Sequence, residues 1–406
     1  MEGSYVSPVR SNGAGGVRSG HAGGDRFNLS ATAVRHAVFS SDLRAALLEA
    51  DSSLSVEIVS IIRDDPASHP PEVAATIHQE IIADYAKAAD QLNRSGFDVV
   101  LIEHEYGIFG GESGKYVLEL VNNLTVPIAV TLHTVLEKPA PDRAEILKAL
   151  CDRAALVMVF TETARRMVVE QGLADFDRVR VVPHGAPDEL TEVAWSDRDE
   201  TLSPSLQLGL PSLAGRTVLS TFGLISDSKG LELAIRALPE ITAAHPEVRY
   251  LIAGQTHPEV INKEGESYRH SLQCLVNDLD LYDHVWFIDR FLTIEELAQL
   301  LGRTDLYLTP YRSKDQIVSG ALTFAVAAGC PVVSTPYFYA EDLLSSGAGV
   351  LVPFGDSGKL AAAVLDLLNS PAKMRGARVA ARRVGADLAW ASVGKATLEL
   401  LTEVAQ

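Results

Sequence analysis

Residues 217–230 read TVLSTFGLISDSKG, and this stretch decides the fold. Its first seven residues, Thr217–Gly223, form an apolar run of strand length, which is typical of parallel strands buried on both faces. The polar turn that follows carries Lys229 and leads into a helical pattern, with Ser226 to Ser228 as candidate caps and apolar side chains at Leu231, Leu233, Ala234 and Leu238. The stretch therefore predicts one strand–turn–helix unit of a doubly wound sheet.

The same alternation extends in both directions from this stretch. Further apolar runs of strand length occupy residues 97–103, 127–132, 156–161, 178–182, 249–254, 284–288, 306–309, 331–335 and 349–352. Helical patterns lie between them: one or two helices over 71–94, and single helices over 142–154, from Thr293 with a capping box to Glu296, and from near Ser319 to a stop at Gly329 and Pro331. The chain is therefore expected to be α/β, with two Rossmann-like, doubly wound parallel-sheet domains.

Composition suggests where the domains begin and end. Residues 1–27 are rich in Gly, Ser and Arg and predict a flexible N-terminal tail. Residues 28–188 form the first expected domain. Residues 189–216 are polar, contain two prolines and keep no period, so we expect a linker there. The second expected domain covers 217–385.

The overall composition narrows the class of protein. The chain has 406 residues, of which 47% are apolar and 22% charged, as in ordinary globular proteins. A net charge of −18 argues against nucleic acid or anionic membranes as main partners. No run approaches the roughly 18 apolar residues of a membrane helix, and the start has no signal-peptide core. Three irregularly spaced cysteines favour a reducing cytoplasm over a disulfide framework or a zinc site.

Polar residues follow the strands of the first domain, at the edge where open parallel sheets bind ligands. Glu103, His104, Glu105 and Tyr106 come after one strand, followed by Gly110 and Gly111, and His133 ends the next. His184 lies in a Pro-His-Gly turn at the domain boundary. Each has a plain structural interpretation as well: a surface turn with a packed histidine, a structural histidine at a strand end, and a hinge without ligand contact.

The second domain offers two phosphate-binding turns. One holds Gly223, Ser226 and Lys229, although any surface lysine near a turn would look similar. The other, Gln316–Leu322, places Ser319, Gly320 and Ala321 at a helix N-terminus. Two helix N-termini with a lysine would bind a diphosphate without metal. No Asp-x-Asp pair sits in a loop suited to Mg²⁺, and Asp64 and Asp65 are adjacent, so no metal site is predicted.

With these clusters in order, residues 28–406 resemble the retaining GT-B glycosyltransferases of group 1 (family 4). The motifs GLISDSKG, LIAGQTHP, DLYLTPY and AVAAGCPVVSTP carry the resemblance in the second half, and EHEYGIFGGE, TLHTVLEKP and VVPHGAPD carry it in the first. The resemblance implies two Rossmann-like domains with an interdomain cleft. It also implies that the last helix, within 386–406 and with Trp390, crosses back to the first domain.

The resemblance also implies roles. His133 would touch the donor sugar, with Glu105 and His104 beside it in the catalytic set. Lys229 would bind the diphosphate, the segment Phe287–Leu292 would hold the base, and the donor set would comprise Gly223, Ser226, Lys229, Gly254, Arg290, Phe291, Gln316, Ser319, Gly320, Ala321 and Leu322. The acceptor side would comprise Arg35, His36, Gly110, Gly111 and His184, with Arg35 and His36 in the stretch that replaces the family's glycine-rich loop.

Three positions depart from the family pattern. Leu224 stands where an arginine is usual, and Gln316 and Phe324 stand where the family has two glutamates eight residues apart. The second glutamate normally binds the ribose, so ribose recognition is expected to differ here, with Asp315, Glu341 or Asp342 as substitutes.

The expected function is transfer of a sugar from a nucleoside-diphosphate sugar, GDP or UDP with a lean toward GDP, to a small soluble acceptor such as a specialised metabolite or a thiol. Transfer would proceed with retention and without a metal ion or cofactor. The protein is expected in the cytoplasm, and an oligomeric state is possible. Two alternatives remain at this point: a sugar-nucleotide epimerase of the same fold, and a catalytically dead sugar-nucleotide-binding protein.

Overall fold

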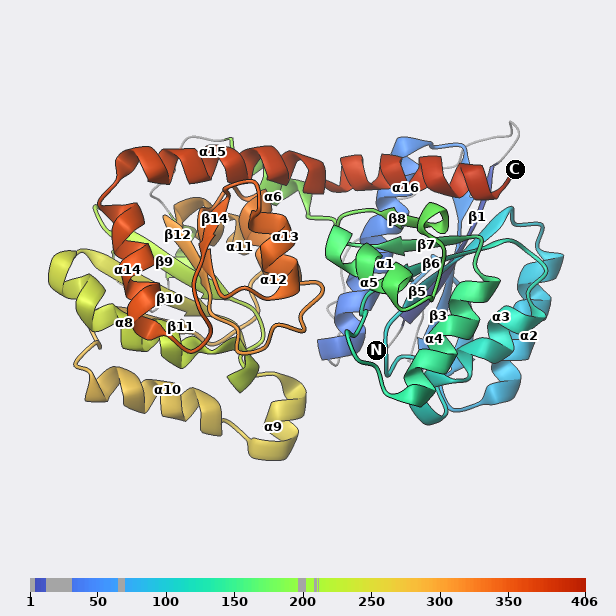
Figure 1. The fold of residues 1–406 in the computed structure, drawn as a ribbon, viewed down its shortest axis with the longest axis horizontal. Coiled ribbons are helices and arrows are strands. Elements are labelled where there is room, and N and C mark those ends of the chain that lie inside the picture. Colours follow the sequence, from blue (N-terminus) through green and yellow to red (C-terminus); the bar gives the residue numbers. More distant parts are fainter. Residues whose placement is uncertain (1–3, 12–30, 65–69, 196–201, 208–209, 211) are drawn as a thin grey trace. The chain divides into compact units, whose positions relative to one another are not determined.

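The computed structural model describes residues 4–11, 31–64, 70–195, 202–207, 210 and 212–406, and side chains are not described for 4–11, 31–37 and 258–259. The chain forms two compact units. The first combines Met1–Pro183 with Trp390–Gln406, and the second is continuous over His184–Ala389. Figure 1 shows the chain coloured along its sequence, and each unit is built on its own sheet.

The first unit holds an eight-stranded sheet with the order β4-β3-β1-β5-β6-β7-β8, and β2 pairs with β1. Neighbours pair in parallel except at β1, which is antiparallel to β2, β3 and β5. The strands are β1 (Ser4–Ser11), β2 (Leu54–Val56), β3 (Ile58–Ile62), β4 (Val73–His78), β5 (Val99–His104), β6 (Ile128–Leu132), β7 (Leu156–Val159) and β8 (Val179–Val181).

The helices of the first unit are α1 (Ala31–Ala50), α2 (Ile82–Arg94), α3 (Val117–Asn123), α4 (Pro141–Arg153), α5 (Glu162–Glu170) and α16 (Trp390–Val404), with short 3-10 turns at Glu112–Gly114 and Phe176–Arg178. Helix α16 packs on α1 (Figure 1), and the rings of Trp390 and Phe39 lie 5.2 Å apart, edge to face. A methyl group at Gly394 would come within 2.6 Å of Ala46, so the two helices touch where only glycine fits.

The second unit holds a parallel six-stranded sheet with the order β11-β10-β9-β12-β13-β14. Its strands are β9 (Thr217–Phe222), β10 (Val248–Ala253), β11 (Val285–Ile288), β12 (Leu306–Thr309), β13 (Val332–Ser334) and β14 (Gly349–Leu351). The chain moves outward from β9 to β11 and then returns to β12 on the other side of β9. That reversal between β9 and β12 is the place where such sheets bind ligands.

The helices of the second unit are α6 (Asp188–Val193), α7 (Pro204–Gln207), α8 (Leu231–Ala244), α9 (Pro258–Glu264), α10 (Ser267–Asp278), α11 (Ile294–Arg303), α12 (Gly320–Ala327), α13 (Phe338–Leu344), α14 (Ser357–Leu368) and α15 (Pro371–Leu388). The predicted capping box of α11 is confirmed, because Thr293 accepts from the amide of Glu296 and the carboxylate of Glu296 accepts from Thr293. The strands predicted from both halves of the sequence are confirmed in position, although β8 and β14 are only partly buried.

Residues 71–94 are only partly helical, which corrects the prediction for this stretch. Val73–His78 form strand β4, parallel to β3, and the helix α2 starts at Ile82. The strand carries β-branched side chains, including Thr76 and Ile77, which favour extended backbone. Because β4 lies at the edge of the sheet and is only partly buried, it lacks the continuous apolar run that marks the central strands.

The prediction of a flexible tail over residues 1–27 is wrong for Ser4–Ser11. These residues form β1, between β3 and β5, so this sheet is mixed and not wholly parallel. Tyr5, Val6 and Val9 are strong strand formers, but their pattern is short and bordered by glycine-rich sequence, so composition outweighed it in the prediction. Residues 12–30 lie outside the described residues.

The expected linker over 189–216 is part of the second unit. It contains α6 and α7, and its leucines Leu202, Leu206 and Leu213 are buried against Val218 and Leu251. The unit boundaries therefore fall at Pro183–His184 and at Ala389–Trp390, where the predicted positions were 188 and 386. These leucines lie four and seven residues apart, which is a helical spacing, but Pro204 and Pro211 interrupt the stretch, so no helix was predicted there.

Candidate functional site

Two glycines end the adjacent strands β9 and β10, and their loops nest closely. Gly223 has φ +124 and Gly254 has φ +136, a region that disfavours L side chains. A Cβ on Gly254 would lie 2.0 Å from the carbonyl oxygen of Gly223. Only glycine therefore lets these two loops approach each other at the carboxyl edge of the sheet.

The loop after β9 meets the loop after β12 at the reversal point of the sheet. Gly230, with φ 61, would place a Cβ 2.2 Å from the carbonyl oxygen of Pro310, and the amide of Arg312 donates to the carbonyl of Ser228 at 3.0 Å. Lys229 lies over the ring of Tyr311, with Nζ 3.9 Å from the centroid. The sequence did not point to Tyr311, which brings the two predicted turns together.

The structure corrects the predicted N-cap of helix α8. Ser226 and Ser228 hydrogen-bond each other through their hydroxyls at 2.8 Å. The N-cap position of α8 is Gly230, which has no side chain to accept a hydrogen bond. The close approach to Pro310 requires a glycine at the N-cap position of α8, so no serine can cap this helix. Backbone contacts shape the loop instead.

Helix α12 begins next to Tyr311. The Tyr311 hydroxyl lies 3.3 Å from Oγ of Ser319, the N-cap residue of the helix. Ser319 accepts the amide of Leu322 on its hydroxyl at 3.3 Å and the amide of Thr323 on its carbonyl at 2.9 Å. The Leu322 side chain is buried and its amide is bound to Ser319, and the donor contact of Leu322 stays a prediction. The first-turn amides of Gly320 and Ala321 remain the positive end of the helix.

His184 is placed with this helix. The position of a Cβ on Gly320 lies 3.8 Å from Cε1 of His184, and the imidazole packs edge to face on Phe324 at 6.4 Å. His184 was expected on the acceptor side, in the first domain. The structure instead puts it in the second unit, next to the predicted phosphate-binding helix, because the chain passes between units one residue before it.

The segment after β11 combines a scaffold arginine with two exposed groups. Arg290 makes a bidentate ion pair with Glu296, at 2.6 and 2.9 Å, and this contact lowers the pKa of Glu296 to about 2. Asp289 lies 2.7 Å from the buried guanidinium of Arg269 and keeps a side chain that is 55% exposed. Phe291 is 61% exposed. Arg290 therefore serves the fold, whereas Asp289 and Phe291 are presented to solvent.

Gln316 is held in place by hydrogen bonds to backbone groups of neighbouring residues. Its side-chain amide donates to the carbonyl of Val318 at 2.8 Å, and its own carbonyl accepts the amide of Tyr339 at 3.0 Å. Gln316 therefore shapes the turn that leads into α12, and any contact it makes with a donor stays a prediction.

In the first unit, His133 forms a buried pair with Glu103. His133 Nε2 lies 2.7 Å from Oε2 of Glu103, and the two residues are 3% and 1% exposed. Thr131 donates to the other carboxylate oxygen of Glu103 at 3.3 Å. The rings of Phe39 and Phe160 pack edge to face on the imidazole, at 4.8 and 5.0 Å. The sequence placed Glu103 in the polar cluster but did not pair it with His133.

Burial sets the protonation of this pair. Desolvation raises the pKa of Glu103 to about 8 and lowers the pKa of His133 to about 3, because the apolar surroundings disfavour both charges. At neutral pH the pair is therefore an uncharged carboxylic acid that donates to a neutral imidazole. The packing gives His133 a structural role; its predicted contact with the donor sugar stays a prediction.

The other two predicted catalytic residues differ from each other in burial. His104 is buried and stacks on Phe109 with ring centroids 5.7 Å apart. Glu105 is half-buried, accepting from the hydroxyl of Thr134 at 2.6 Å and from the amide of Tyr106 at 2.7 Å. Of this set, Glu105 is the most accessible acid or base.

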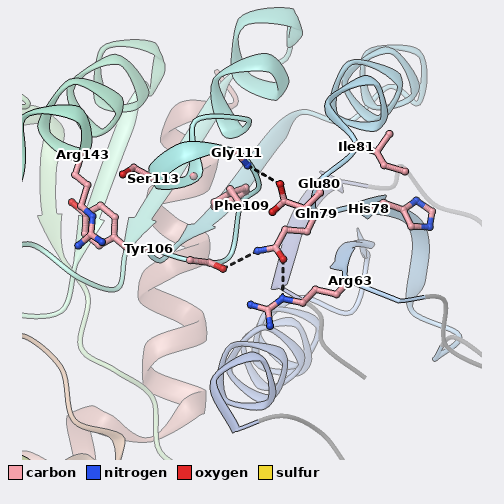
Figure 2. Close-up of a pocket in the computed structure, with 12 residues that line it drawn as sticks. Arg63, His78, Gln79, Glu80, Ile81, Tyr106, Phe109, Gly111, Ser113 and Arg143 are labelled. Atoms are coloured by element: carbon pink, nitrogen blue, oxygen red, sulfur yellow. Dashed lines mark hydrogen bonds between the residues drawn. The ribbon is translucent and has the colours of Figure 1, made fainter. Parts of the chain in front are cut away.

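The first unit also contains a cavity of about 710 Å³ at the carboxyl edge of its sheet (Figure 2). Loops that follow β3, β4 and β5 line it, together with one residue of α4. Its lining includes Arg63, His78, Gln79, Glu80, Ile81, Tyr106, Gly107, Phe109, Gly111, Ser113, Gly114 and Arg143. A cavity of this size and position is typical of small-molecule sites in open sheets.

The predicted acceptor residues are divided by the structure. Gly111 lines the cavity, and Gly110 lies beside it, where a Cβ would come 1.7 Å from the carbonyl oxygen of Gln79. Arg35 and His36 fall in α1 instead of a loop, and their side chains lie outside the described part of the chain. Arg63 and Arg143 were missed. Arg63 follows β3 and Arg143 lies in α4, and no sequence motif joins them.

Within the ranges that the structure describes, no group of three or more His, Cys, Asp or Glu side chains is placed to hold a metal ion. Over the same residues, no helix has both the length and the apolar character needed to cross a bilayer.

Two units with doubly wound sheets define a GT-B protein, and solved structures agree with this class. The chain superposes on the crystal structure of Anabaena HepE in complex with UDP with a TM-score of 0.63 at 19% identity, covering 82% of this chain and 86% of HepE. For sucrose-phosphate synthase from Thermosynechococcus elongatus the TM-score is 0.65 at 19% identity, over 84% and 86% of the two chains. The fold is GT-B.

A family model matches within the second unit: residues 216–370 match the model for glycosyl transferases group 1. A Mycolicibacterium smegmatis protein named GDP-mannose-dependent alpha-(1-6)-phosphatidylinositol monomannoside mannosyltransferase is 28% identical over 197 residues, which are 47% of this chain and 49% of that protein. The D-inositol 3-phosphate glycosyltransferase of Kineococcus radiotolerans is 26% identical over 307 residues, 69% and 67% of the two chains. The chain thus spans about half the length of the first of these relatives.

Proposed function

We propose that the protein is a glycosyltransferase that moves a sugar from a nucleoside-diphosphate sugar to a small acceptor, with retention and without a metal ion. One observation carries the proposal: Lys229, Tyr311 and Ser319 converge in the second unit, next to the first turn of α12. A lysine and a helix N-terminus together suit a diphosphate. The family match falls on the unit that contains this arrangement.

The neighbouring arginine supports this assignment of Lys229. Arg312 follows Tyr311 but is committed to carboxylates, with Glu232 at 2.8 Å and Asp227 at 3.6 Å. Lys229 by contrast lies on an aromatic face, which leaves its ammonium group the donors that a phosphate oxygen accepts. We refer to Lys229, Ser319, Gly320 and Ala321 as the phosphate cradle.

The first testable prediction concerns metal. A lysine and the positive end of α12 would offset the charge that develops on the leaving diphosphate, so a divalent ion is not needed for this purpose. Transfer of a radiolabelled sugar from its nucleotide to an acceptor is expected to continue in excess EDTA at the rate found without chelator. If EDTA stops the reaction and added Mg²⁺ or Mn²⁺ restores it, the cradle does not act as proposed.

We further propose that the donor base is guanine. Asp289 follows β11, two strands from β9, and strands are spaced by ~4.8 Å, so the carboxylate lies on the order of 10 Å across the sheet from the cradle. That is about the span from a diphosphate to its base. Guanine presents two adjacent N–H donors to a carboxylate, whereas uracil presents a single N–H between two carbonyls. Arg269 fixes the carboxylate, and the exposed Phe291 offers a ring for stacking.

The second prediction tests this base. The protein is expected to bind GDP more tightly than UDP in calorimetry, and Asp289→Asn is expected to narrow that ratio by about fivefold, because the amide repels one guanine donor. Asp283→Asn, at an exposed position before β11, is the matched control and should leave the ratio unchanged. An equal affinity of the parent for both nucleotides would refute guanine recognition.

The acceptor is proposed to be small, with specialised metabolites and thiols as candidates, and the cavity of the first unit is its proposed site. We place the protein in the cytoplasm, since among the described residues its cysteines form no disulfide. A panel of acceptors, assayed with a GDP-sugar and a UDP-sugar, tests the transfer itself: release of nucleoside diphosphate that depends on acceptor supports it. Epimerisation of the donor without acceptor would contradict it.

A further inference from the structure

Lys229 and Tyr311 face each other because the residues on both sides of them are in contact. Ser228, just before Lys229, accepts on its carbonyl the amide of the residue after Tyr311 at 3.0 Å. Gly230, just after Lys229, would place a Cβ 2.2 Å from the carbonyl oxygen of Pro310, the residue before Tyr311. The backbone of the two loops therefore fixes their register, with the lysine opposite the tyrosine.

A second aromatic ring holds the ring of Tyr311 in place. Tyr311 and Tyr337 are both buried and stack with their centroids 4.8 Å apart and an angle of 14° between the planes. Nζ of Lys229 lies 3.9 Å from the Tyr311 centroid. Stacked rings leave no room for an ammonium group between them, so Lys229 and Tyr337 lie on opposite faces of Tyr311. The ring is therefore the middle layer of a stack, which restricts its tilt.

Tyr311 is also anchored at its backbone and at its hydroxyl. Its carbonyl accepts the hydroxyl of Thr335 at 2.7 Å, and its own hydroxyl lies 3.3 Å from Oγ of Ser319. Ser319 is the N-cap of α12 and accepts the amide of Leu322. One side chain thus connects the lysine to the helix terminus, and it fixes the ammonium group relative to the first-turn amides of the phosphate cradle.

The aromatic face orients Lys229 without neutralising its charge. Two carboxylates of the same region, Glu232 and Asp227, lie 2.8 and 3.6 Å from the guanidinium of Arg312. A carboxylate on Lys229 would compete with a phosphate for the ammonium group, whereas a ring leaves N–H donors for the phosphate oxygens. A lysine that is already restrained also loses less conformational entropy when the ligand binds.

We propose that Tyr311 is a positioning residue of the donor site: its ring holds the ammonium group of Lys229 in place for the diphosphate of a nucleotide sugar. This inference rests on the proposed function and adds to it a residue that acts through the lysine. The attraction comes from the negative face of the aromatic ring. It therefore depends on the charge distribution of the ring, which separates positioning from packing.

Two replacements of similar shape test the role of the ring in the full-length protein. Tyr311→Phe keeps the negative face, whereas replacement of Tyr311 by pentafluorophenylalanine, introduced by stop-codon suppression, keeps the ring but reverses its charge distribution. GDP and UDP are the calorimetric probes. Tyr311→Phe is expected to bind them nearly as the parent does. The fluorinated variant is expected to bind them about fivefold more weakly than Tyr311→Phe, which corresponds to ~1 kcal/mol.

The same pair of replacements in the Lys229→Ala protein is the control. Without the ammonium group the charge distribution of the ring has no partner, so both rings should give equal affinity there. An equal loss with and without Lys229 would assign Tyr311 to packing alone. Because Tyr311 is buried, the melting temperature of each variant is recorded. Tyr282→Phe, at an exposed position of the same unit, should match the parent.

The measurements separate this inference from the proposed function. If the parent binds neither GDP nor UDP, or if Lys229→Ala binds them as the parent does, the phosphate cradle is wrong and the role of Tyr311 falls with it. If Lys229→Ala weakens binding but the fluorinated variant binds as Tyr311→Phe does, the cradle stands and only the positioning by Tyr311 is refuted.

Discussion

Replacing His133 with alanine is expected to lower kcat ~10²-fold per folded molecule while nucleotide affinity changes by no more than a few-fold. It is also expected to lower the free energy of unfolding by about 2–5 kcal/mol, because Glu103 loses the acceptor of its buried hydrogen bond and two phenylalanines lose a packing partner. The first effect follows from the proposed contact with the donor sugar, and the second from the observed packing.

Both quantities must come from one preparation, with unfolding followed in urea and turnover normalised to folded protein. Lost stability with retained kcat would assign His133 to packing alone. Glu103→Gln is the matched variant, since a glutamine N–H can replace the protonated carboxyl as donor to the imidazole. It should therefore keep most of the stability that His133→Ala loses.

The pH dependence of stability separates the two residues further. A pKa of Glu103 raised to about 8 means that its stabilising effect is complete below the ordinary carboxyl pKa and is lost as pH rises through about 8. The lowered pKa of His133 acts in the opposite direction, with stability lost as pH falls toward about 3. The parent should therefore lose stability from about pH 6.5 to 8, and Glu103→Gln should not.

Replacing Lys229 with alanine is expected to weaken nucleoside-diphosphate binding tenfold or more, and each tenfold corresponds to ~1.4 kcal/mol. Leu224 occupies the position where group 1 proteins usually carry an arginine, and Arg312 is bound to carboxylates. The lysine on Tyr311 thus carries most of the positive charge that the cradle offers. The side chain is only partly buried, so the fold should persist.

The dissociation constant of one nucleoside diphosphate is measured by calorimetry for the parent and for three variants, Lys229→Ala, Lys359→Ala and Tyr311→Phe. Lys359→Ala removes an exposed lysine of the second unit and should bind as the parent does. Tyr311→Phe keeps the ring under the ammonium group and removes the hydroxyl near Ser319, so it should bind nearly normally if the ring is what positions Lys229. An unchanged dissociation constant for Lys229→Ala would remove this residue from the site.

The sequence predicted the parts of the fold that depend on local pattern. The central strands, such as β5 and β9, are largely buried and rich in apolar residues, and the capping box of α11 lies within four residues. Strands that depend on their neighbours were missed: β4 is an edge strand, and β1 pairs with residues almost a hundred positions away. Pairing over such distances has no local signal in one sequence.

The candidate site shows the same division. Lys229 and Ser319 stood out because each lies at a turn before a helix, but Tyr311, which joins them, is an ordinary strand-end tyrosine by sequence. Arg63 and Arg143 are eighty residues apart and follow no motif. His184 was assigned to the wrong unit because only the packing on Phe324 reveals where the chain crosses.

The division of the first unit along the chain has a consequence for synthesis. Its strands and first five helices emerge from the ribosome early, but α16, which covers α1 and seats Trp390 against Phe39, is made last. The second unit is one continuous stretch and can complete its core as soon as Ala389 has emerged. The part of the protein translated first is therefore the last to finish folding, and it waits with the face of α1 uncovered while the other unit is being made.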